Sequence, residues 1–262
     1  MRHCHFTICP VTALAGAILL WSASWGLADE KDGAWGTITG QVVLDAATVP
    51  ERKPLEINKD QDHCLSKGPI LSEEWIVNTK NKGVRWVFVW LAPQTADQKL
   101  AVHPSLEKIG PKQVSMDQPC CMFVPHALAI REGQEVEAKN SAPVPHNVHW
   151  TGHPLKNPGG NQILPSKQSL VISGLKSDKY PVQISCDIHG WMKAWIRVFD
   201  HPYFALTDED GKFQIKLAPA GNYRLLLWHE AGGFGPGGRE GIPITVKGGG
   251  TTDAGKIKLK LQ

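Results

Sequence analysis

Short apolar segments of strand length recur along the whole chain, and they constrain its fold more than any other feature. The run Val84–Leu91 reads Val-Arg-Trp-Val-Phe-Val-Trp-Leu and stops before Pro93. Gly, Pro, Asn and Asp separate such runs from one another. The others are Thr39–Leu44, Ala127–Ile130, Val136–Asn140, Asn147–Trp150, Ser169–Ser173, Val182–Ser185 and Ala194–Phe199. The pattern predicts an all-β sandwich, decorated by loops or short helices over 46–80 and 94–118, with a helical turn at Leu106–Ile109.

Residues 200–262 predict a second, small β unit. Phe204–Thr207 and Phe213–Leu217 flank a polar turn, and Tyr223–Trp228 follows a second turn. The Asp-Gly-x-Phe hairpin and the Pro-x-Gly-x-Tyr turn of this stretch resemble carboxypeptidase regulatory-like (transthyretin-like) sandwich domains. That resemblance implies a non-catalytic module. The predicted organisation is a leader at 1–28, a first sandwich at 37–199 and the second unit at 200–262.

The first 28 residues have the pattern of a signal peptide. Arg2 gives a positive start, Val11–Trp21 is apolar, and Gly26-Leu27-Ala28 is a small-residue cleavage site. The apolar run is short for a bilayer span. We therefore expect an exported protein, periplasmic or extracellular, without a stable membrane span. Without the leader the chain has 28 − 1 = 27 basic and 25 acidic side chains, a net charge of +2 that gives no reason to expect nucleic-acid binding.

Four cysteines remain after the leader. They are Cys64, Cys120, Cys121 and Cys186. If Cys186 binds a metal, an oxidising compartment favours one disulfide among the other three, with Cys64 paired to Cys121 or Cys120. A vicinal bridge between Cys120 and Cys121 would be strained. A minor alternative is a Cu(I) cluster that combines these cysteines with His63 and His126.

The segment Cys186-Asp187-Ile188-His189-Gly190-Trp191-Met192 places a thiolate, an imidazole and a thioether within seven residues. Upstream, Pro145-His146-Asn147-Val148-His149-Trp150 offers a second imidazole from another predicted strand. Two histidines, a cysteine and a weak axial methionine form the ligand set of an electron-transfer copper site. Zinc competes chemically for Cys and His. It rarely recruits a thioether, however, and no second cysteine lies nearby.

These two motifs resemble amicyanin, a member of the cupredoxin (plastocyanin-like) family, over roughly residues 125–199. The resemblance implies a Greek-key β-sandwich and one type 1 (blue) copper per chain, with His146, Cys186, His189 and Met192 as ligands. It also implies that Asn147 ties the two ligand segments together and that an exposed edge of His189 is the electron exit. The departure is Gly190-Trp191, where amicyanin has Pro-Phe.

The function that follows from this resemblance is single-electron transfer by an exported copper protein. The partner would be a redox protein such as a c-type cytochrome or a dehydrogenase. Two alternatives remain open: an exported copper-binding or storage protein, and a structural β-sandwich module without metal.

We expect a carrier rather than an enzyme. The mature chain has neither the His-x-His pairs of a trinuclear cluster nor a second cysteine in the copper loop. The G-x-G-x-x-G match at Gly233–Gly238 contains Pro236 and lacks a βαβ context. The pair His229-Glu230 is predicted to be a surface pair rather than an acid/base couple.

Overall fold

The computed structural model describes residues 32–95 and 97–261, so the predicted signal peptide lies outside the described part. The prediction of an all-β chain with two β units is confirmed. Two short helices, α1 (Gln61–Cys64) and α2 (Pro104–Glu107), accompany the strands. The strands are β1 (Trp35–Leu44), β2 (Phe88–Pro93), β3 (Gln113–Met116), β4 (Ala127–Arg131), β5 (Glu135–Lys139), β6 (His146–Thr151), β7 (Gly160–Leu164), β8 (Ser169–Ile172), β9 (Val182–Ser185), β10 (Lys193–Phe199), β11 (Phe204–Leu206), β12 (Lys212–Pro219), β13 (Gly221–His229), β14 (Gly233–Phe234), β15 (Ile242–Val246) and β16 (Thr251–Leu259).

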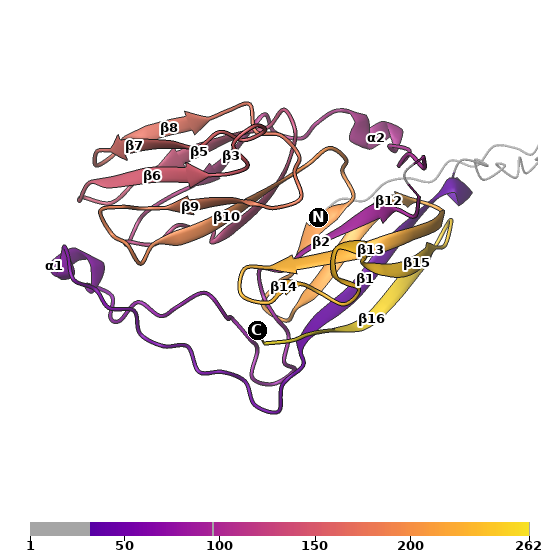
Figure 1. Cartoon of the computed structure of the whole chain (residues 1–262), viewed down its shortest axis with the longest axis horizontal. Coiled ribbons are helices and arrows are strands. Elements are labelled where there is room, and N and C mark those ends of the chain that lie inside the picture. Colours follow the sequence, from indigo (N-terminus) through magenta and orange to yellow (C-terminus); the bar gives the residue numbers. More distant parts are fainter. Residues whose placement is uncertain (1–31, 96, 262) are drawn as a thin grey trace, which may run out of the picture.

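The first sandwich contains β3 to β10. One sheet has the order β4-β10-β9-β6-β7 and the other the order β3-β5-β8. Alternating apolar residues of the two sheets, among them Val136, Val148 and Ile196, meet in one buried cluster. Figure 1 shows these strands as a separate layered body beside the remaining strands. Because β6 and β9 are neighbours, the start of β6 lies close to the loop that follows β9.

The second sandwich draws strands from both ends of the chain. Its sheets have the orders β12-β1-β16 and β11-β2-β13-β14, and β15 pairs with residues 221–225 of β13 on the edge that also carries β14. The strands predicted at 39–44 and 84–91 do not lie in the first sandwich, although the predicted bounds of that unit, 37–199, include them. They belong instead to the second unit, whose strands therefore do not begin at residue 200. Their apolar faces pack against Tyr223, Leu225 and Ile257.

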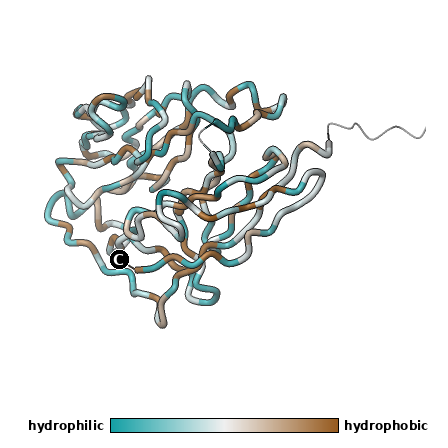
Figure 2. The backbone as a smooth tube through the Cα atoms, turned by 45° about the vertical axis from the view of Figure 1, so that its right-hand side comes forward, coloured by the Kyte–Doolittle hydropathy of each residue, from teal (hydrophilic) through white to brown (hydrophobic). Residues whose placement is uncertain are grey.

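The two sandwiches share a third buried cluster. Phe88 and Trp90 of β2 and Leu226 and Trp228 of β13 meet Phe199 of β10 and Ala127 of β4. In Figure 2 the hydrophobic colours follow the strands of both units, whereas many outer loops are hydrophilic. Buried aromatic contacts of this kind fix the orientation of one unit on the other.

The segment between β1 and β2 leaves the second sandwich, reaches α1 at the far end of the first sandwich, and returns (Figure 1). A disulfide between Cys64 and Cys121 fastens α1 there. An isolated antiparallel bridge between Pro54 and Leu71 links the outgoing and returning stretches of this segment. We call residues 57–65 the cap.

Among residues 32–95 and 97–261, no helix has the length and apolar character needed to cross a membrane.

Candidate metal centre

His146, Cys186 and His189 converge at one end of the first sandwich. His146 is the first residue of β6, and the loop between β9 and β10 carries Cys186 and His189. The Nδ1 atoms of the two histidines lie 2.9 Å apart. The Sγ atom of Cys186 lies 4.0 Å from Nδ1 of His146 and 3.8 Å from Nδ1 of His189. Bonds of about 2.0–2.3 Å to one ion would hold three ligand atoms at separations of this size.

The three side chains are buried, with exposed fractions of 0% for both histidines and 2% for Cys186. Burial, together with a smaller contribution from the neighbouring His189, lowers the pKa of His146 to about 4. The pKa of His189 is also lowered by burial, against an opposing contribution from Asp60. Both imidazoles are therefore neutral near pH 7, which is the form that binds a metal.

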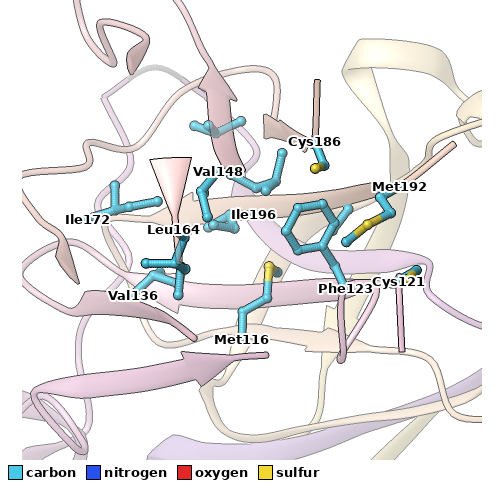
Figure 3. Close-up of a cluster of buried hydrophobic side chains, with 14 of the residues drawn as sticks. Met116, Cys121, Phe123, Val136, Val148, Leu164, Ile172, Cys186, Met192 and Ile196 are labelled. Carbon is cyan, nitrogen blue, oxygen red and sulfur yellow. The ribbon is translucent and has the colours of Figure 1, made fainter. Parts of the chain in front are cut away.

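Met192 lies in the same buried cluster as Cys186. Figure 3 labels Cys186, Met192 and Phe123 toward one side of that cluster. Two backbone hydrogen bonds fold the loop: Met192 N–H donates to the carbonyl of His189 (2.9 Å), and Cys186 N–H donates to the carbonyl of Met192 (3.3 Å). The loop thus returns the methionine toward the cysteine that opens it.

Asn147 joins the two ligand segments. Its Oδ1 accepts hydrogen bonds from the backbone N–H groups of Asp187 (2.6 Å) and Ile188 (3.1 Å). Its own backbone N–H points at Sγ of Cys186, 3.4 Å away. The structure therefore has the tie that we expected from the resemblance. An N–H directed at a thiolate sulfur stabilises its negative charge and tunes a bound metal.

The expectation of an exposed His189 is wrong. Its ring is fully buried, and Nε2 lies 2.8 Å from Oδ2 of Asp60 in the cap. The disulfide at Cys64 holds the cap in place, and Nε1 of Trp191 donates to the carbonyl of Cys121 (3.1 Å). No sequence pattern indicated this contact, since Asp60 lies in a predicted loop 129 residues before His189.

The neighbouring histidines do not join the group. His149 is 39% exposed, and its Nδ1 lies 3.0 Å from Oδ1 of Asp187. His153 is exposed. The group of side chains that converge here therefore contains His146 and not His149.

The structure selects one of the possible disulfides, Cys64–Cys121, and leaves Cys120 and Cys186 as free thiols. Cys64 and Cys121 also approach His189, but disulfide sulfurs are not thiolate ligands. The alternative of a Cu(I) cluster on these cysteines is therefore contradicted.

The prediction that His229-Glu230 is a surface pair is also wrong, because His229 is 1% exposed and Glu230 contacts His126.

No protein-family model and no curated protein matches the chain. Among solved structures, it is similar to a purple cupredoxin from Nitrosopumilus maritimus, with 18% identity over 32% of this chain and 98% of that one, at a TM-score of 0.28. A copper(I) form of an amicyanin variant is 14% identical over 42% of this chain and 98% of that one, with a TM-score of 0.31. A copper-containing nitrite reductase from Thermus scotoductus SA-01 is 21% identical over 38% of this chain and 27% of that one, with a TM-score of 0.32. At these scores the similarities carry no weight for function, which has to be inferred from the residues themselves.

Proposed function

We propose that the chain is an exported electron carrier that binds one copper ion through His146, Cys186 and His189, with Met192 as a weak axial ligand. The observation that supports this is the convergence of two neutral imidazole Nδ1 atoms and one buried thiol. A thioether in the same loop distinguishes the set from an ordinary zinc site. A bound copper ion would supply the one-electron chemistry, since it is stable as Cu(II) and as Cu(I).

The residues around the site favour small structural change during electron transfer. His146 is fixed on a strand, and Asn147 holds the start of the 186–192 loop through two backbone N–H groups. Asp60 fixes the orientation of the His189 ring through Nε2. A buried site whose donors are held by hydrogen bonds excludes water and keeps its geometry when the charge of a bound ion changes.

The burial of His189 favours a second candidate, a copper-holding protein without a redox partner. The cap covers the imidazole edge at which a partner would otherwise make contact. The two functions differ in kinetics. A carrier exchanges electrons rapidly with a small redox protein, whereas a holding protein keeps its copper and exchanges electrons slowly.

We further propose that the partner is a redox protein such as a c-type cytochrome or a dehydrogenase. The second sandwich would be a non-catalytic module, as its resemblance to carboxypeptidase regulatory-like domains implies. Its buried contacts with the first sandwich through Phe88 and Trp228 support a role in positioning the metal centre.

The deciding experiment compares the protein without residues 1–28 and its Cys186→Ser variant, both reconstituted with Cu(II). We expect an intense blue thiolate-to-copper absorption band and a narrow copper hyperfine splitting, both absent from the variant. Equal, weak absorption from both proteins would contradict the copper–thiolate site. Mixing the reduced protein with an oxidised c-type cytochrome in a stopped-flow instrument would then separate a carrier from a holding protein.

A further inference from the structure

A second group of buried titratable side chains lies where three parts of the chain meet. Glu73 belongs to the segment between β1 and β2, His126 precedes β4 of the first sandwich, and Glu230 follows β13 of the second. The exposed fractions of these side chains are 18%, 5% and 11%. The copper site proposed above uses none of them.

One side of the His126 ring is fully occupied. Its Nε2 contacts Oε1 of Glu230, and the other oxygen of Glu230 accepts a hydrogen bond from Nε1 of Trp195 (2.8 Å). A carboxylate held in this way orients the imidazole and keeps the proton on Nε2. In the neutral ring this leaves the Nδ1 lone pair for another partner, and a metal ion at Nδ1 takes the place of the proton that the metal-free ring binds there.

The other side of the ring has no satisfactory protein partner. Nδ1 is buried and makes no hydrogen bond, and the nearest charged atom is Oε2 of Glu73 at 3.5 Å. That distance exceeds the 2.7–3.2 Å of an ordinary N–H···O hydrogen bond. It matches two ligands of one ion, because bonds of about 2.1 Å at a tetrahedral angle place their ligand atoms roughly 3.4 Å apart.

His126 also lines a cavity of about 340 Å³. Glu73, His126 and Glu230 all line it, and Glu74 adds a further carboxylate. The cavity leaves room for water molecules to complete a coordination sphere. The nearby His229 is engaged elsewhere, since its Nδ1 faces the backbone N–H groups of Ala231 and Gly232, each 3.3 Å away.

We propose that Nδ1 of His126 and the carboxylate of Glu73 bind a divalent ion of the zinc class, and that Glu230 is the positioning residue behind His126. With His126 neutral, the two carboxylates leave a charge of −2 that a divalent cation balances. Imidazole and carboxylate are both ordinary zinc ligands. Two protein ligands leave positions for water, which is typical of an exchangeable rather than a closed structural zinc site. This site does not depend on the copper function.

The test measures zinc binding to a protein whose first site is disabled by Cys186→Ser and His146→Ala. Equilibrium dialysis against zinc chloride at neutral pH should give one bound zinc per chain. Adding Glu73→Gln or His126→Gln should abolish that binding. Adding Glu230→Gln should weaken it by roughly 10- to 100-fold, the usual effect of losing a carboxylate behind a ligating histidine.

The matched control is Glu56→Gln, which removes an exposed carboxylate from the same segment and should leave zinc affinity unchanged. Circular dichroism confirms that each variant is folded. Zinc-edge X-ray absorption of the zinc-loaded Cys186→Ser/His146→Ala protein gives a second readout that needs no further variant. We expect one imidazole ligand and otherwise oxygen ligands. Absence of stoichiometric zinc, equal binding by the Glu73→Gln and Glu56→Gln proteins, or a sphere with two imidazoles would each overturn the proposal.

Discussion

Two buried histidines of this chain, His189 and His126, each meet a carboxylate that a distant segment supplies, yet their protonation differs. At the candidate metal centre Asp60 contacts Nε2 of His189, and the pKa of that histidine is lowered by burial. At the junction of the sandwiches, Glu230 and Glu73 flank His126. Burial opposes its protonation there too, but the two carboxylates outweigh it and raise the pKa to about 9.

The difference follows from the number of charges around each ring. His189 faces one partly exposed carboxylate on one side, and on the other side a second imidazole and a thiol. His126 lies between two carboxylates that are themselves largely buried. The first environment keeps an imidazole neutral, so no proton has to leave before a metal binds. The second stabilises a positive charge beside Nδ1, whether a proton or a metal ion carries it.

The largest effect should come from opening the disulfide, which acts on the metal centre and spares the junction. The Cys64→Ser/Cys121→Ser variant loses a link between residues 57 positions apart. We expect the free energy of unfolding to fall by about 2–5 kcal/mol. Chemical denaturation measures the loss. Increased modification of His189, but not of His126, by an imidazole-reactive reagent would show that the cap had been released. Equal increases at both histidines would contradict the prediction that the junction around His126 is unaffected.

The junction should make the metal-free protein less stable in alkali. The pKa of His126 is about 9 in the folded protein, against 6.5 for an ordinary histidine. The stabilisation is therefore complete below about pH 6.5 and disappears as the pH rises through 9, a loss of about 3 kcal/mol at most. Denaturation between pH 6 and 10 with a chelator present measures it. A His126→Gln variant should lack this decline, and an unchanged slope would rule out His126 as its source.

The opposite dependence is expected from the neutral histidines. Burial lowers the pKa values of His146 and His229 to about 4, in each case below the ordinary 6.5. Their contribution to the free energy of unfolding is fully present above about pH 6.5 and is lost as the pH falls from there through 4. The free energy of unfolding, measured by thermal unfolding, should decline between pH 7 and pH 4. Relative to its own value at pH 7, the His229→Gln protein should lose less stability over this range than the wild type. A decline identical to that of the wild type would contradict this assignment.

A smaller effect is expected from Asp60→Asn. A charge-assisted hydrogen bond becomes weaker, and because Asp60 is 31% exposed we expect a loss of about 1 kcal/mol in stability. With copper bound, removing a nearby negative charge should also raise the reduction potential. Asp62→Asn, in helix α1 of the same cap, is the control for long-range charge. Redox titration measures the reduction potential of both variants. Equal increases in this potential would show that the contact with His189 has no special role.

The smallest effect is expected from His149→Ala. His149 is partly exposed and pairs with Asp187 outside the ligand group. Its copper spectrum should match the parent protein, whereas His146→Ala should weaken the blue band. Absorption spectra of the two reconstituted variants test this, and the reverse pattern would assign the wrong histidine to the site.

Much of the fold was predictable because strands leave a local pattern. The predicted segments at 127–130, 136–140 and 182–185 correspond to β4, β5 and β9. The polar strands β3, β7 and β16 were missed, since Gln113–Met116 and Gly160–Leu164 lack a strong apolar pattern. Which strands pair with one another was harder to predict than where strands occur. The apolar face of β1 fits either core, and only its register with β12 and β16 decides between them.

The candidate ligands were predictable for a different reason. Cys186, His189 and Met192 share one loop, so their spacing is visible in the sequence. The contacts that set the protonation of the two histidines are not local. Asp60 meets His189 across 129 residues, and Glu230 meets His126 across 104. Such pairs depend on how β1 and β2 route the intervening segment, which no local pattern records.

The pairing of β2 with β11 has a consequence for how the protein is made. Phe204 of β11 lies opposite Trp90 of β2, and all strands of the first sandwich come between them in the chain. During synthesis from the N-terminus, β3 to β10 emerge complete and can close on themselves, while β1 and β2 must wait for β11 to β16. The first sandwich can therefore fold before the second is complete, and the apolar run 84–91, which includes the start of β2, is the part of the nascent chain with the longest need of protection from aggregation.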